Sequence, residues 1–149
     1  MKIFVTVGTT RFNTLIRRII SEGFFENHEC ILQTGPGGMM TKKFECFEYT
    51  SEIDRYYDWA DIVVSHAGAG SIYRLLSLGK RIVLVPNVDR IDQHQLDIAT
   101  FMHNNNYAIA VYDFNVLSRA IENAAAADFI SFESLEFFVA EEIITFIDQ

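Results

Sequence analysis

The sequence predicts an α/β fold, a Rossmann-like parallel sheet with helices on both faces. The chain has 149 residues and is 50% apolar, enough for a single domain over residues 1–149 with its own core. Short apolar runs alternate with amphipathic ones, which indicates alternating strands and helices. The strand-like runs are continuous Val, Ile and Leu, which is typical of parallel strands that are covered on both faces.

The elements are predicted in order along the chain. The expected strands cover residues 3–7, 30–34, 44–47, 62–65, 82–85 and 108–112. The expected helices cover residues 14–21, 53–59, 71–78, 94–104 and 116–127. Gly79 and the Asn run 104–106 supply helix stops. Parallel strands joined in this way need right-handed crossovers.

Composition excludes several classes of function. The net charge is -8, and residues 120–149 hold seven acidic residues and no basic one, so no basic stripe for a nucleic acid is present. The apolar runs are short, and Lys2 precedes a strand-like run, so we expect no membrane span and no signal peptide. Cys30 and Cys46 lack metal-site spacing, and we expect buried reduced thiols in a cytoplasmic protein.

Small and amide-bearing residues collect where the predicted strands end. They are Gly8-Thr9-Thr10, Gly35-Pro36-Gly37-Gly38, residues 66–71, Pro86-Asn87, and residues 92–95 at the start of the next helix. Ligands of open parallel sheets bind beyond the carboxyl ends of the strands. The pattern therefore predicts a polar ligand of sugar or nucleotide size.

The run 65–71 (SHAGAGS) leads from a buried strand into a helix, which predicts an anion site at the helix N-terminus. Gly68 and Gly70 would let the main chain approach a phosphate, and Ser71 would add a hydroxyl at the helix start. The alternative is that the glycines only make a tight strand-to-helix turn.

Five motifs in order resemble the donor-binding, carboxy-terminal half of GT-B glycosyltransferases, the glycosyltransferase family 28 C-terminal domain. They are residues 5–10 (VTVGTT), 66–71 (HAGAGS), 78–80 (LGK), 83–87 (VLVPN) and 92–95 (DQHQ). The resemblance spans residues 3–112 and is strongest to the small soluble subunits of two-component transferases. These include the catalytic subunit for dolichol-linked GlcNAc transfer and bacterial exopolysaccharide and capsule transferase subunits.

The resemblance implies one half of a GT-B fold in an inverting, UDP-sugar-dependent glycosyltransferase that is inactive alone. It implies a membrane-anchored partner subunit that binds the acceptor, a lipid-linked saccharide, and a cytoplasmic chain held at the inner membrane face through that partner. It also implies no metal and no cofactor besides the UDP-sugar substrate, because backbone N–H groups stabilise the leaving diphosphate. Asp89 and Asp92 alone do not make a metal site.

The resemblance also implies which residues bind the donor: Gly8, Thr9, His66, Gly68, Ala69, Gly70, Ser71, Asn87, Gln93 and Gln95. His66 could contact the donor, act as a catalytic base, or only bond the backbone. Gln95 matches a sugar-hydroxyl reader, although a solvated first-turn residue would look the same. Asn87 could equally be a turn residue. Arg74 stands where larger relatives carry a ribose-binding Glu; it could reach a phosphate or a donor carboxylate, or point to solvent.

Three further interpretations stay open at this point. A non-catalytic stabilising subunit is compatible with Arg74. A dinucleotide-binding oxidoreductase domain would use Gly68-Ala69-Gly70 and Asp89, but it lacks the third glycine. Finally, a C-terminal helix over about 133–147, apolar on more than one face and rich in Glu, is expected to dock the partner, although it could also be a half-exposed tail helix.

Overall fold

The computed structural model describes residues 1–90 and 93–131, so the helix expected over 133–147 lies outside the described residues. Its centre is a six-stranded sheet in the order β3-β2-β1-β4-β5-β6, and every neighbouring pair is parallel. The strands are β1 (Lys2–Thr6), β2 (Glu29–Gln33), β3 (Glu45–Phe47), β4 (Ile62–Ser65), β5 (Arg81–Leu84) and β6 (Ile109–Ala110). The predicted parallel α/β fold is confirmed.

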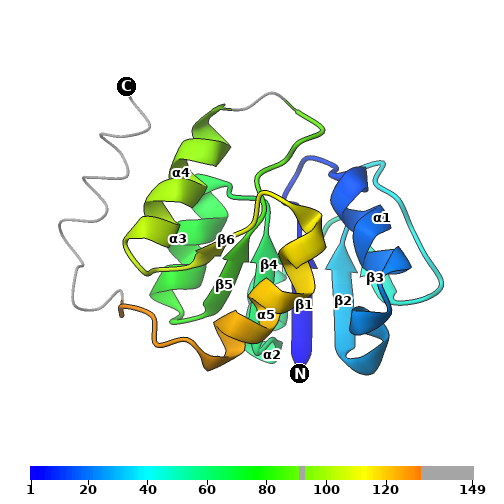
Figure 1. The fold of residues 1–149 in the computed structure, drawn as a ribbon. Helices are drawn as coiled ribbons and strands as arrows, with labels where there is room; N and C mark the ends of the chain where they lie inside the picture. Colours follow the sequence, from blue (N-terminus) through cyan, green and yellow to red (C-terminus); the bar gives the residue numbers. More distant parts are fainter. Residues whose placement is uncertain (91–92, 132–149) are drawn as a thin grey trace.

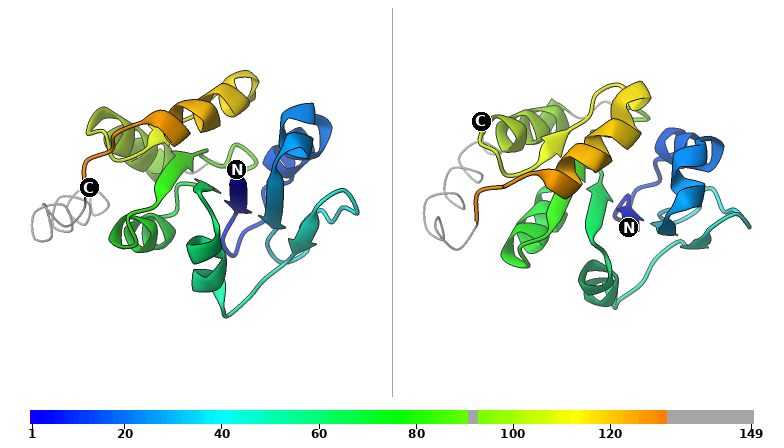
Figure 2. Two further views of the ribbon diagram at one scale, coloured as in Figure 1. Left: turned by 90° about the horizontal axis from the view of Figure 1, so that it is seen from below. Right: turned by 60° about the horizontal axis from the view of Figure 1, so that its bottom comes forward.

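Helices cover both faces of the sheet (Figures 1 and 2). They are α1 (Asn13–Ser21), α2 (Ile53–Trp59), α3 (Ala69–Ser77), α4 (Gln93–Asn104) and α5 (Leu117–Ala126), with 3-10 turns η1 (Gly23–Asn27) and η2 (Phe114–Val116). Apolar residues of α1 and α5 pack in one buried cluster, and those of α2, α3 and α4 pack in a second. Figure 2 shows α1 and α5 on the opposite side of the sheet from α2 and α3.

The strands supply both clusters because successive side chains point to opposite faces. On β1, Ile3 and Val5 belong to the α1 and α5 cluster, whereas Phe4 belongs to the other, and all three are fully buried. The Phe4 ring lies 5.3 Å from the Tyr56 ring and 5.9 Å from the Tyr57 ring of α2. This packing holds α2 against the face of the sheet to which Phe4 points.

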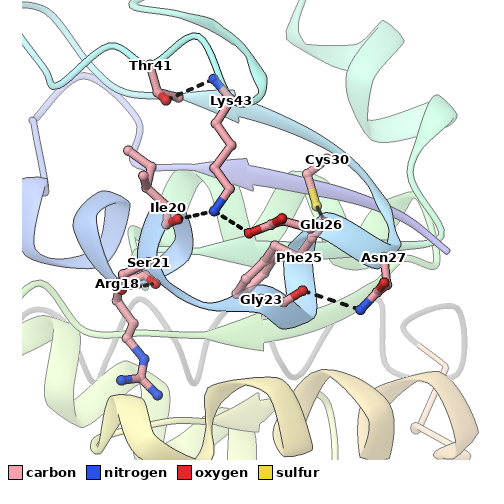
Figure 3. Close-up of polar contacts among 10 residues, drawn as sticks. All are labelled: Arg18, Ile20, Ser21, Gly23, Phe25, Glu26, Asn27, Cys30, Thr41 and Lys43. Atoms are coloured by element: carbon pink, nitrogen blue, oxygen red, sulfur yellow. Dashed lines mark hydrogen bonds and ion pairs between the residues drawn. The ribbon is translucent and has the colours of Figure 1, made fainter.

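The connection from β2 to β3 is tied to the end of α1 (Figure 3). Lys43 Nζ donates to Ile20 O at 2.6 Å and lies 2.5 Å from Glu26 Oε1. The Thr41 hydroxyl accepts the Lys43 backbone N–H at 3.0 Å. These contacts hold the far end of the segment that begins with Gly35-Pro36-Gly37-Gly38.

Several predicted boundaries were wrong by a few residues. Helix α3 begins at Ala69 rather than at residue 71, α4 begins at Gln93, and η2 replaces the start of the last predicted helix. Both cysteines are free as predicted, but only Cys30 is buried, and Cys46 is half-buried on the short β3 near the sheet edge. Among the residues the structure describes, no helix is long and apolar enough to cross a membrane.

Candidate functional site

The strand order creates a crevice between β1 and β4. These strands are neighbours, yet the helix after β1 packs on one face of the sheet and the helix after β4 packs on the other. The two turns that leave the strands therefore diverge at the carboxyl edge, which is where open α/β sheets bind ligands. The predicted residues of the first turn, Gly8 and Thr9, and those of the second, His66 to Ser71, meet at this point.

The imidazole of His66 packs against both turns. An ideal Cβ on Gly8 would stand 2.7 Å from His66 Cε1, and one on Gly68 would stand 2.4 Å from His66 Nε2. Gly8 also has φ +64, a left-handed conformation that favours glycine. Packing within the chain therefore explains why glycine stands at positions 8 and 68, because a side chain at either position would collide with the His66 ring.

Gly70 differs from these two glycines. It is exposed, and a Cβ built on it would meet no atom within 4 Å. The tight-turn explanation therefore accounts for Gly8 and Gly68 but not for Gly70. Open space at Gly70 is what a ligand lying on the first turn of α3 would need.

Helix α3 begins without a side-chain cap. Gly68 is its N-cap residue, and the Gly68 carbonyl accepts the Ile72 N–H at 3.0 Å. The first N–H groups of a helix have no acceptor within the helix, so those of Ala69, Gly70 and Ser71 are directed toward the carboxyl edge. The preceding Ala67 is fully buried with φ +57, a conformation that costs about 1 kcal/mol for a non-glycine residue.

Helix α1 opens at the same edge but is capped. Asp89, from the segment after β5, accepts the Thr14 backbone N–H at 3.0 Å with one carboxylate oxygen and the Thr14 hydroxyl with the other. A carboxylate at a helix N-terminus is favourable for both hydrogen bonding and the helix dipole. Asp89 therefore fills the anion position at α1, whereas the N-cap residue of α3, Gly68, supplies no side-chain cap among the residues that the structure describes.

Ser71 does not begin the helix as predicted. It is the third residue of α3, and its side chain is hydrogen-bonded with Tyr57 of α2. Burial raises the pKa of Tyr57, and the bond with Ser71 opposes that shift. The helix starts earlier because Gly68 adopts an extended conformation that already presents its carbonyl to Ile72.

A pocket of about 230 Å³ adjoins the N-terminus of α3. It is lined by Thr6, Gly8, Thr9, Gln33, Tyr49, Thr50, Ser51, Ile53, Tyr57 and Ser71. Thr6 Oγ1 donates to Gln33 Oε1 at 2.5 Å, so two buried polar side chains meet at the floor of the carboxyl edge. The sequence reasoning missed both, although a polar residue ending an otherwise apolar strand was a usable signal. It also missed Tyr49, which is 62% exposed at this pocket.

Asn87 joins three segments at the same edge. It is 4% exposed, its backbone N–H donates to Gln95 Oε1 at 2.9 Å, and its Nδ2 donates to Arg11 O at 3.3 Å. The exposed Gln93 donates to Asp97 Oδ1 at 3.3 Å within α4. The structure thus gives Asn87 a positioning role for Gln95 and the β1–α1 turn, while contact of these side chains with a donor stays a prediction.

Arg74 is exposed and pairs with a carboxylate of the chain itself, and its expected contact with a phosphate or a donor carboxylate stays a prediction. Its Nε and Nη2 atoms bind the two carboxylate oxygens of Asp54 on α2 at 3.0 and 2.6 Å. This hydrogen-bonded pair lowers the pKa of Asp54 and raises that of Arg74. The pair forms because α2 and α3 pack on the same face of the sheet.

No group of three His, Cys, Asp or Glu that could hold a metal ion occurs in the part of the chain that the structure describes. Asp89 serves as the cap of α1, and Asp92 lies outside the described residues.

Comparison with known proteins agrees with this geometry. The family model described as Glycosyltransferase family 28 C-terminal domain matches residues 2–129. The chain belongs to this family. It is 36% identical over 118 residues to the UDP-N-acetylglucosamine transferase subunit ALG13 of Mus musculus, covering 70% of this chain and 10% of that protein.

Two further comparisons are with a bacterial transferase and with a solved structure. It is 37% identical over 118 residues to the UDP-N-acetylglucosamine--N-acetylmuramyl-(pentapeptide) pyrophosphoryl-undecaprenol N-acetylglucosamine transferase of Parabacteroides distasonis, covering 72% of this chain and 32% of that protein. The solution structure of ALG13 superposes with a TM-score of 0.65 at 22% identity, covering 97% of each chain. The chain therefore spans about a tenth of the length of the Mus musculus protein and about a third of the length of the Parabacteroides distasonis protein.

Proposed function

We propose that this chain is the donor-binding half of an inverting glycosyltransferase that uses a UDP-sugar, with UDP-N-acetylglucosamine as the first candidate. The observation that carries the proposal is the uncapped N-terminus of α3, with open space at Gly70, beside a pocket at the switch point of the sheet. Both curated relatives described above are named as N-acetylglucosamine transferases, which supports the choice of sugar.

The donor is placed by matching its parts to these features. The diphosphate lies on the N–H groups of Ala69, Gly70 and Ser71, where the helix dipole favours negative charge. The nucleoside enters the 230 Å³ pocket, where Tyr49 offers an exposed ring. The transferred sugar extends toward Gln95, whose carbonyl oxygen is held by the Asn87 N–H.

Catalysis in this proposal depends on stabilising the departing diphosphate. Oriented N–H groups at the point where negative charge develops lower the barrier without a metal ion. We therefore propose that transfer needs no metal, and that activity survives a chelator. His66 acts mainly as a positioning residue, since its ring sets the spacing of the two turns that carry the N–H groups.

The acceptor side is proposed to come from a second protein. Relatives in this family are several times longer than the matched region, or are named as subunits. We propose a heterodimer with a membrane-anchored subunit that binds a lipid-linked saccharide, and thereby a cytoplasmic, membrane-peripheral location in exopolysaccharide or other glycan synthesis. The segment 133–147 stays the predicted docking element.

Replacing Gly70 tests the proposal, because the site is open and the fold should tolerate a side chain there. Gly70→Leu should weaken binding of UDP and UDP-N-acetylglucosamine at least tenfold in calorimetry, with the melting temperature little changed. Ser77→Leu, an exposed change at the other end of α3, is the matched control and should bind as the wild type does. Absence of any UDP binding by the wild type, or unchanged binding by Gly70→Leu, would refute the proposal.

A second candidate is a non-catalytic stabilising subunit, favoured by Arg74, which has no acceptor atom and is held by Asp54. It predicts that Gly70→Leu leaves the activity of the reconstituted pair intact. The oxidoreductase interpretation has lost its support, because Asp89 caps α1 and the chain belongs to family 28.

A further inference from the structure

Two buried polar side chains stand side by side where β1 and β2 end. Thr6 and Gln33 are register partners in this parallel pair, and both are almost completely buried. Thr6 shares a face of the sheet with Phe4, because side chains two residues apart on a strand point the same way. Gln33 shares the same face with Ile31, since Phe4 and Ile31 pack in the cluster with α2, α3 and α4. Thr6 and Gln33 therefore lie together in the pocket of about 230 Å³ on that face.

A chain of hydrogen bonds sets the orientation of the Gln33 amide. The Gly8 backbone N–H donates to Thr6 Oγ1 at 3.3 Å, and a hydroxyl that accepts there still has its own hydrogen to donate. Thr6 Oγ1 donates this hydrogen to Gln33 Oε1 at 2.5 Å. A side-chain amide has an acceptor oxygen at one end and a donor NH₂ group at the other. Because Thr6 occupies the oxygen, the donor atom Nε2 is the end of Gln33 that is left for the pocket.

Gln33 Nε2 makes no hydrogen bond with any residue that the structure describes, although the residue as a whole is only 3% exposed. The nitrogen is not enclosed by the core, because Gln33 lines the pocket. Burying an amide without a partner is unfavourable, and nearly all such groups in folded proteins are hydrogen-bonded. An acceptor atom placed in the pocket would complete the hydrogen bonding of Gln33.

The pocket around this amide is polar but uncharged. Its ten lining residues are of the types Thr, Ser, Tyr, Gln, Gly and Ile, with no Asp, Glu, Lys, Arg or His among them. Such a lining suits a neutral group with polar atoms, whereas a phosphate is bound by cations or by a helix N-terminus. The hydroxyl groups can donate or accept, so they do not select between an acceptor and a donor on the ligand. Among these lining side chains, the Gln33 amide with its oxygen occupied is the group that can only donate.

We propose that Gln33 selects the base of the donor nucleotide by donating a hydrogen bond to the 4-keto oxygen of uracil. This inference rests on the proposed function, which places the nucleoside in this pocket. In a pyrimidine the carbon at position 4 lies opposite the nitrogen that carries the ribose, so a base that enters the pocket presents its 4-substituent to the most buried side chains. Uracil has an oxygen there, which accepts from Nε2. Cytosine has an amino group, which would meet Nε2 donor to donor and leave both unpaired.

The test measures the ratio of UDP affinity to CDP affinity of the full chain by calorimetry, because general damage to the fold lowers both affinities together. The wild type should bind UDP at least about tenfold more tightly than CDP. Gln33→Met, an apolar side chain of similar length, should reduce this ratio to less than about threefold, mainly by weakening UDP. Thr6→Val tests the same mechanism independently. It removes the hydroxyl that orients the amide, so Gln33 can turn its oxygen toward the pocket, and CDP binding should improve relative to UDP.

Thr34→Val is the matched control. Thr34 is the next residue after β2 and is fully buried, its hydroxyl donates to Phe47 O at 3.5 Å, and it does not line the pocket. This variant should lose stability but keep the wild-type ratio of UDP to CDP affinity. Three results would overturn the inference: equal binding of UDP and CDP by the wild type, a wild-type ratio in Gln33→Met, or a wild-type ratio in Thr6→Val. Failure of the proposed function looks different, since the wild type would then bind neither nucleotide.

Discussion

Replacing Gly68 by alanine tests whether His66 sets the geometry of the donor turn. The added Cβ would stand 2.4 Å from His66 Nε2 and 2.8 Å from Cε1. Carbon and nitrogen atoms in contact prefer about 3.5–4.0 Å, so the ring or the turn must move by roughly 1 Å. The Gly68 backbone, at φ -77 and ψ 129, is accessible to any residue, so the cost is steric rather than conformational.

The expected loss of stability follows from these contacts. Overpacking of this kind costs about 1–3 kcal/mol, and replacing an N-cap glycine by alanine adds about 0.5 kcal/mol. In a His66→Ala background the ring is gone, so Gly68→Ala should cost only the capping part. The free energy of coupling between positions 66 and 68 should therefore equal the overpacking part, about 1–3 kcal/mol.

The assay is urea denaturation of the wild type, the two single variants and the double variant. Gly70→Ala is the control, because its Cβ meets no atom within 4 Å, and it should be neutral or stabilising by up to about 1 kcal/mol. An equal cost of Gly68→Ala in both backgrounds would refute the reasoning. If the ring does set the turn, UDP affinity should fall in Gly68→Ala and also in His66→Ala.

Three further predictions concern residues around the site. Asn87→Ala should destabilise the protein by about 1–3 kcal/mol in urea denaturation, because it removes a buried amide that joins loop segments; a cost under 0.5 kcal/mol would contradict that role. Arg74 lowers the pKa of Asp54, so this carboxylate stabilises the fold above its unfolded pKa and loses that effect as the pH falls through its folded pKa. The gap in melting temperature between wild type and Asp54→Asn should thus be present at pH 7 and shrink below about pH 4, whereas a gap that does not change with pH would disprove the link. Burial raises the pKa of Cys30 to about 12, so a thiol reagent at pH 8 should modify the half-buried Cys46 first, and equal rates would be evidence against the packing.

The parts of the fold that sequence could predict are those governed by local chemistry. Continuous runs such as Ile62-Val63-Val64 identify buried parallel strands, and glycines after them mark the turns. The start of α3 was misplaced because Gly68 and Ala69 carry no capping side chain, so no local signal marks the boundary. The sequence indicated Ser71 as the hydroxyl residue at the start of the helix, but its side chain is hydrogen-bonded with Tyr57 of α2.

The parts that sequence could not predict depend on residues far apart in the chain. The sequence connected Asp89 only with a metal site, which was not expected, and with an incomplete dinucleotide-binding motif. In the structure Asp89 caps a helix that begins 76 positions earlier, at Asn13. For Arg74 the sequence left a phosphate, a donor carboxylate or solvent open, and its partner in the structure is Asp54, which only the packing of α2 beside α3 brings near. Which charged side chains pair depends on how the helices and strands pack, so a single sequence without the fold does not determine the pairs.

A contrast between α3 and the two helices α1 and α2 supports the assignment of the donor to α3. Any helix N-terminus attracts an anion, so the dipole of α3 alone would not single it out. The chain satisfies the N-terminus of α1 with Asp89, and α2 carries Asp54 in its first turn, whereas the first turn of α3 contains no acid and no side-chain cap. The same turn has a glycine that faces open space, beside a pocket with buried polar side chains. An Asp introduced at Gly70 would supply the missing anion from within the chain, and should therefore stabilise α3 while abolishing UDP binding, an outcome that a purely structural turn would not produce.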